Sequence, residues 1–113
     1  MDFTVKQEDN TVTIQTNVDR LNASNVTGLK AELSLLSKGS INNIIIDMSK
    51  TKYCDSSGLS AILMANRLCK DTNGKFALCG LQSNVQKLIK IAQLDKVLTI
   101  AEDKNEALEV MSV

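Results

Sequence analysis

The feature that most constrains the fold is a change in hydrophobic period on either side of residues 53–60. Before this segment, residues 41–48 form a short isoleucine-rich run with no polar alternation, which predicts a strand buried on both faces. After it, apolar residues from Leu59 to Cys69 recur at helical spacing, with Asn66 and Arg67 on the outer side. The sequence therefore predicts a buried strand that leads through a short connection into an amphipathic helix.

The connection itself carries residues suited to a helix N-terminus. Asp55 and Ser56 stand where the helix needs an N-cap, because their side-chain oxygens can accept hydrogen bonds from free backbone N–H groups. We expect Ser56 to be the cap, with Asp55 as the alternative, and Ser57 to present its hydroxyl outward. Gly58 leaves out a Cβ that would crowd an anion at the positive end of the helix dipole. These residues predict an accessible serine with room for a phosphate; a purely structural cap is the alternative with the same composition.

The rest of the chain predicts strands that alternate with helices. A β-hairpin is expected over residues 3–16, where apolar positions alternate with polar ones after a polar turn. Asn22 is placed to cap the first helix, and Ser83 with Gln86 forms the pattern of a capping box before a later one. The other expected elements are a first helix ending near 39, a strand at 75–80, a helix burying 85, 88, 89 and 92, a strand at 96–100 and a final helix from about 104.

This order, ββαβαβαβα, predicts an α/β fold with about four α-helices. The 113 residues suffice for one core, so a single domain over residues 1–113 is expected. Alternating strands and helices favour a mainly parallel sheet, with the N-terminal hairpin as its antiparallel edge. In such sheets functional groups collect beyond the carboxyl ends of the strands, where residues 53–58 are expected to lie.

Composition argues against several classes of function. Thirteen basic and thirteen acidic residues cancel, which does not favour binding to nucleic acid or to an anionic membrane surface. One tyrosine, two phenylalanines and no tryptophan leave little surface on which bases could stack. The apolar runs are too short to cross a bilayer and the N-terminus lacks a secretory signal. We therefore expect a cytoplasmic protein without direct membrane insertion.

The motifs of common enzymes are missing from the sequence. Without histidine there is no Ser-His-Asp triad, and no glycine-rich phosphate or dinucleotide loop is present. The three cysteines do not have the spacing of a zinc site. A small α/β enzyme stays open as an alternative, because Asp19, Asp47 and Asp55 could hold Mg²⁺ and Cys54 could form a thiolate near a helix N-terminus.

The motif Asp-Ser-Ser-Gly-Leu at residues 55–59, between an aliphatic strand and an apolar helix, resembles the signature of bacterial anti-sigma factor antagonists, which are stand-alone STAS domains. The acidic loop at residues 19–23 and the segments 94–98 and 105–108 are also similar, so the resemblance covers nearly the whole chain. It implies a STAS-like fold and a regulatory protein rather than an enzyme.

The resemblance implies partner switching. An anti-sigma factor that is also a serine kinase would phosphorylate Ser57, and a metal-dependent serine phosphatase would remove the phosphate. The unphosphorylated antagonist would bind the kinase and release sigma factor, and phosphorylation would abolish that binding. ATP and Mg²⁺ would belong to the kinase, and this chain would need no cofactor. The residues implied in binding the partner or orienting the site are Asp19, Asn22, Asp55, Ser56, Gly58 and Leu59. A regulatory or assembly subunit of a membrane transporter complex is the alternative.

Overall fold

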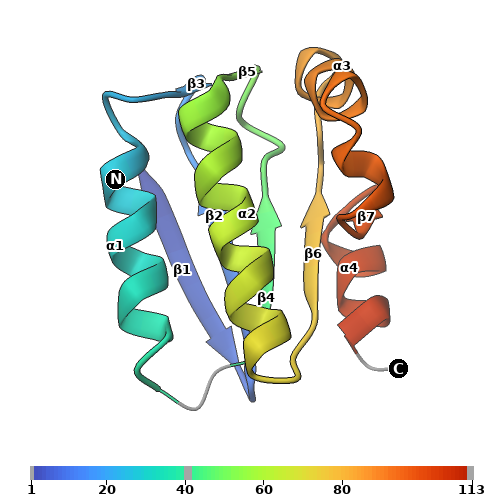
Figure 1. Cartoon of the computed structure of the whole chain (residues 1–113). Coiled ribbons are helices and arrows are strands. Elements are labelled where there is room, and N and C mark those ends of the chain that lie inside the picture. Colours follow the sequence, from blue (N-terminus) through green and yellow to red (C-terminus); the bar gives the residue numbers. More distant parts are fainter. Residues whose placement is uncertain (1, 40–41, 112–113) are drawn as a thin grey trace.

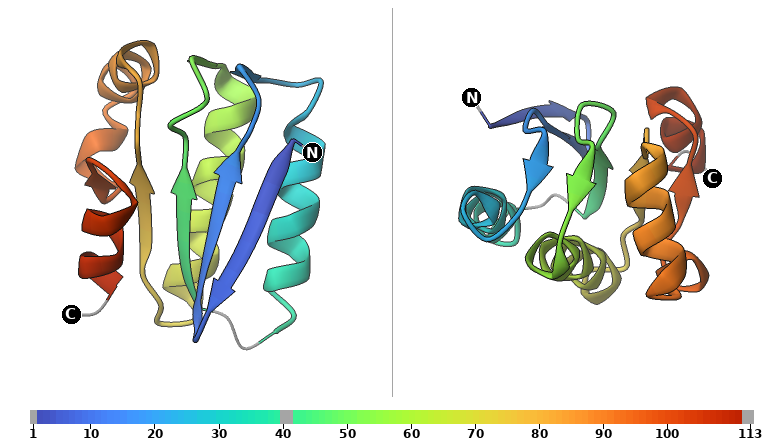
Figure 2. Two further views of the ribbon diagram at one scale, coloured as in Figure 1. Left: turned by 180° about the vertical axis from the view of Figure 1, so that it is seen from behind. Right: turned by 90° about the horizontal axis from the view of Figure 1, so that it is seen from above.

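The computed structural model describes residues 2–39 and 42–111 and shows a mixed five-stranded sheet with helices on both faces (Figure 1). Helices α1, α2 and α3 lie on one side of the sheet and α4 on the other (Figure 2). The strands of the sheet are β1 (Phe3–Glu8), β2 (Thr11–Thr16), β4 (Asn43–Asp47), β6 (Phe76–Cys79) and β7 (Ile100–Ala101). The helices are α1 (Val26–Leu36), α2 (Ser56–Asp71), α3 (Ser83–Ile91), the 3₁₀ turn η1 (Leu94–Lys96) and α4 (Lys104–Met111).

The strand order is β1-β2-β4-β6-β7. β1 pairs with β2 antiparallel, while the β2–β4, β4–β6 and β6–β7 pairs are parallel. The predicted hairpin edge and mainly parallel sheet are therefore confirmed. A separate parallel pair, β3 (Arg20–Leu21) with β5 (Tyr53–Cys54), was not predicted from the sequence.

The central strand β4 is buried on both faces, as its sequence predicts. Ile44 and Ile46 belong to the core under α1 and α2, whereas Ile45 packs in a second cluster with Ala77 and the residues of α4. Because both faces of this strand are covered, a polar alternation would have placed unpaired polar groups in one of the two cores. Residue 41, which the sequence assigned to the same strand, lies outside the described residues.

The start of α1 differs from the prediction. The helix begins at Val26, and Asn25, at its N-cap position, makes no side-chain capping hydrogen bond. Asn22, the predicted cap, forms a turn of its own, because its side-chain oxygen accepts from the backbone N–H of Ser24 at 3.0 Å. Asparagine readily bonds the backbone two residues ahead, and here that local turn is formed instead of a cap.

Three predictions for the C-terminal third are also corrected. Ser83 is the first residue of α3 rather than its cap, so the predicted capping box does not form. Ala92, which was predicted to be buried by this helix, is exposed. The strand expected at 96–100 is displaced, since Gln93 adopts a left-handed conformation (φ 59°) that leads into η1, and β7 begins only at Ile100. An exposed Val97 followed by a buried Leu98 gives the alternation that is typical of a strand, but a turn produces the same pattern.

Candidate functional site

The short pair of β3 and β5 brings two loops to the carboxyl-end edge of the sheet. Arg20 stands opposite Tyr53 and Leu21 opposite Cys54. The backbone carbonyl of Asp19 accepts from the N–H groups of residues 52 and 53, at 2.9 and 3.1 Å, and that of Leu21 accepts from residue 55 at 3.2 Å. These bonds place the predicted acidic loop directly beside the Asp-Ser-Ser-Gly motif.

Two buried threonines fix the segment that leads into the motif. Thr16, at the end of β2, and Thr51 are both fully buried, and their hydroxyl oxygens lie 2.6 Å apart. The Thr51 oxygen also lies 2.8 Å from the carbonyl oxygen of Val18. If Thr16 donates to Thr51 and Thr51 donates to Val18, both hydroxyl groups are satisfied away from water. The loop after β4 is thereby bound to the loop after β2.

Asp55 is the N-cap of α2. Its backbone is extended, and one carboxylate oxygen accepts from the backbone N–H groups of Ser57 at 2.9 Å and Gly58 at 3.1 Å. A carboxylate here satisfies two of the helix's free donors and also interacts favourably with the helix dipole. The alternative cap is thus the observed one, and the expectation that Ser56 caps the helix is wrong.

The two serines of the motif differ in their exposure. Ser56, the first helical residue, is exposed and lines a groove on the side of η1. Ser57 is half-buried, and helical periodicity puts it on the same face as Met64 and Leu68. Ser57 is therefore less exposed than the sequence predicted, although its side chain forms no hydrogen bond within the described residues.

Glycine is required at position 58 for a structural reason that differs from the predicted one. A Cβ at this position would lie 2.5 Å from Cys54 Sγ and 3.0 Å from the carbonyl oxygen of Leu21. The missing side chain therefore faces the interior and not an anion at the helix end. Glycine allows α2 to approach β3 and β5 closely, which holds the motif against the acidic loop.

Cys54 is not the activated thiol that its place in the sequence suggested. Burial, together with the negative charge of Asp55, raises the pKa of the Cys54 thiol to about 11. The N–H groups that could have stabilised a thiolate are instead bound to the Asp55 carboxylate. A protonated thiol does not favour the thiolate role that the enzymatic alternative gave to Cys54.

A cation–π pair on the rim of the site was also not predicted from the sequence. The Arg20 guanidinium carbon lies 4.5 Å from the centroid of the Tyr53 ring, and the tyrosine is 41% exposed. The two residues become neighbours only through the β3–β5 pairing. The side chain of Asp19 is exposed next to them, and Leu59, one turn into α2, lies partly buried at the core edge.

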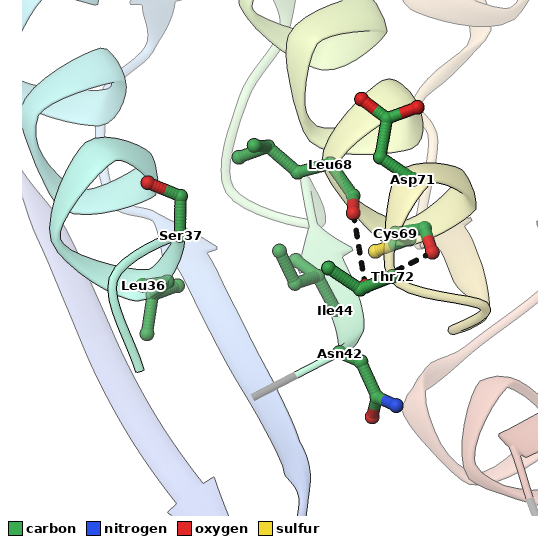
Figure 3. Close-up of a pocket in the computed structure, with 8 residues that line it drawn as sticks. All are labelled: Leu36, Ser37, Asn42, Ile44, Leu68, Cys69, Asp71 and Thr72. Atoms are coloured by element: carbon green, nitrogen blue, oxygen red, sulfur yellow. Dashed lines mark hydrogen bonds between the residues drawn. The ribbon is translucent and has the colours of Figure 1, made fainter. Parts of the chain in front are cut away.

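One pocket that lies away from the motif is too small for a typical ligand. A pocket of about 60 Å³ lies between the C-terminal ends of α1 and α2, at the opposite end of α2 from Ser57 (Figure 3). Its rim is tied by Thr72, whose hydroxyl lies 3.0 Å from the carbonyl oxygen of Leu68. That volume is well below the roughly 300 Å³ of the smallest typical ligand pocket. Among the described residues, no cluster of acidic or cysteine side chains could hold a metal, and no helix is long and apolar enough to span a membrane.

The chain is similar to known proteins in both sequence and structure. Residues 2–107 match the model of the STAS domain family. The candidate anti-sigma factor antagonist BtrV of Bordetella bronchiseptica is 23% identical over 87 residues, which cover 77% of this chain and 75% of that protein. A candidate anti-sigma factor antagonist from Thermotoga maritima, solved by crystallography, is 25% identical with a TM-score of 0.89, covering 98% of this chain and 95% of the other.

A further solved structure is the phosphorylated form of the Bacillus cell fate determinant SpoIIAA. It is 22% identical with a TM-score of 0.75, covering 95% of this chain and 96% of the other. That likeness is one of fold.

Proposed function

The chain belongs to the STAS domain family, and from this premise we propose that it is an anti-sigma factor antagonist that acts by partner switching at Ser57. In this proposal the unphosphorylated protein binds an anti-sigma factor that is a serine kinase, and sigma factor is released. Phosphate on Ser57 weakens that binding, and a metal-dependent serine phosphatase reverses the modification. The protein has no catalytic role of its own.

The observation that carries the proposal is that Asp55 caps α2 and leaves the Ser57 hydroxyl without a capping role. Asp55 accepts from two of the free N–H groups at the start of α2, so the Ser57 side chain is not needed to cap the helix. Its hydroxyl has no partner among the described residues and is available for modification. Because Asp55 already binds these donors, a phosphate on Ser57 would have to compete for them, and we expect it to remain exposed to the partner.

The size of the charge change is sufficient for a switch. A phosphate adds a charge of about −1.5 to −2 at neutral pH. At about 6 Å from a partner carboxylate, such a charge costs on the order of 1 kcal/mol in a water-like dielectric and about 4 kcal/mol at an effective dielectric of 20. These energies correspond to a loss of affinity between several-fold and roughly a thousandfold. No change of fold is required.

The test compares the wild type, Ser57→Ala, Ser57→Asp and the phosphoprotein as ligands of the purified anti-sigma factor kinase from the same host. Calorimetric titration should show tight binding for the first two and weaker binding for the others. Aspartate carries about half the charge of phosphate, so its effect should be smaller. Both losses should shrink with salt, which screens exposed charges over about 8 Å at physiological ionic strength. Equal affinity of all four proteins, each folded by circular dichroism, would rule out the switch.

A further inference from the structure

A surface groove runs along the outer flank of α2, on the side of the turn that follows α3. Its volume is about 560 Å³, and its wall is formed mainly by apolar side chains. These apolar residues are Leu59, Leu63, Met64, Ala92 and Leu94. The groove therefore offers an apolar contact surface between two elements that lie on the same side of the sheet (Figure 2).

The groove begins at the motif. Ser56 lines it, and Ser56 is also the first residue of α2, directly between the Asp55 cap and Ser57. Ser57, the next residue, is not among the residues that line the groove. A protein that contacts Ser57 at the tip of α2 thus meets the groove as a continuation of the same surface, without crossing another element.

Arg67 is the one charged residue among the described residues that line the groove. Arg67 lies two turns beyond Ser60 on α2, is exposed, and makes no ion pair or hydrogen bond within the described part of the chain. By contrast, Arg20 is stacked on Tyr53 at the rim of the site. An occupant that fits the groove would combine apolar side chains with a carboxylate for Arg67.

We propose that this groove is the docking surface for an apolar segment with an acidic residue on the anti-sigma factor kinase, an inference that rests on the function proposed above. The groove supplies an affinity that does not depend on phosphorylation, through burial of Leu63 and pairing of Arg67. Ser57 supplies the part that phosphorylation removes. Because Ser57 does not line the groove, each contact can be weakened without the other.

Two groove variants and one control test the proposal against the purified kinase. Leu63→Ser should weaken binding of the unphosphorylated protein about tenfold or more, as loss of an apolar interface anchor does. Arg67→Glu should also weaken it, with a loss that shrinks as salt rises. Leu35→Ser is the matched control, because Leu35 is 65% exposed on α1, away from the groove. It should bind like the wild type. Circular dichroism melting confirms that each variant is folded.

The possible outcomes distinguish failure of the groove proposal from failure of the proposed switch at Ser57. Wild-type affinity of Leu63→Ser and Arg67→Glu, with Ser57→Asp still impaired, would overturn the groove and retain the switch. Impaired groove variants with unimpaired Ser57→Asp would retain the groove and overturn the switch. A wild-type protein that does not bind the kinase would overturn both. Sedimentation of the protein alone checks for a second copy as occupant: a dimer that Leu63→Ser dissociates would overturn the proposal.

Discussion

The carboxylate of Asp55 lies 2.9 Å from the backbone nitrogen of Ser57, so the cap of α2 is bonded directly to the residue proposed to accept phosphate. This bond predicts that Asp55, and not Ser56, stabilises the helix start. Asp55→Ala should lower the free energy of unfolding by about 0.5–2 kcal/mol, the usual cost of losing a cap. Ser56→Ala should change it by much less, since the exposed Ser56 side chain bonds none of the described residues. Urea unfolding measures both, and equal losses would contradict the assignment.

The same geometry predicts which serine is modified. We expect the cognate kinase to phosphorylate Ser57, so that Ser57→Ala abolishes incorporation of phosphate and Ser56→Ala retains it. Phosphopeptide mass spectrometry of the two variants distinguishes them. Stoichiometric modification of Ser57→Ala, with none of Ser56→Ala, would transfer the acceptor role to the exposed serine that lines the groove.

Gly58→Ala should destabilise the protein even though it replaces glycine within a helix. Alanine ordinarily gains about 0.5–1 kcal/mol there. In this chain the new Cβ would lie 2.5 Å from Cys54 Sγ, and overpacking of that kind costs about 1–3 kcal/mol. The double variant Cys54→Ala/Gly58→Ala should recover part of the loss, because the obstructing sulfur is gone. A Gly58→Ala protein more stable than the wild type would show that the close approach is unimportant.

The raised pKa of Cys54 predicts low reactivity and a loss of stability at alkaline pH. With a pKa of about 11 instead of 9.0, the thiolate fraction near neutral pH is lower by about a hundredfold. Alkylation of Cys54 should therefore be much slower in the folded protein than in the unfolded one. Mass spectrometry of the timed reaction would measure both rates.

The effect on stability has a definite sign. The folded state keeps the Cys54 proton at a pH where the unfolded state has lost it, so this contribution to stability falls as pH rises from about 9.0 to 11. The decline should be steeper in the wild type than in Cys54→Ser, whose hydroxyl does not titrate. Identical pH profiles would contradict the shifted pKa.

Much of this fold follows from the local sequence. The isoleucine run of β4 predicted a strand covered on both faces, and the helical spacing after Leu59 predicted α2, because burial imposes those patterns directly. The β3–β5 pair could not be predicted, since each strand has two residues and is stabilised by a partner more than thirty positions away. Without that pair, the Arg20–Tyr53 contact and the interior role of Gly58 are invisible in the sequence.

Helix starts were predicted less well than helix faces. Near each predicted start several residues could cap, and the choice depends on the path of the preceding chain. Asn22 forms a local turn, and Asp55 is chosen over Ser56 because β5 delivers it in an extended conformation. The sequence therefore predicted that the motif begins a helix, as it does, while the contacts of its individual side chains required the tertiary structure.

The buried hydroxyl pair of Thr16 and Thr51 has a consequence for how fast and how tightly any protein can associate with this site. Because the pair ties the loop before Tyr53 to the end of β2, that loop is ordered together with the sheet when the chain folds. A binding protein then meets a preorganised surface, and little conformational entropy remains to be lost at the moment of encounter. On such a surface, the effect of one added charge on binding affinity is not reduced by rearrangement of the backbone beneath it.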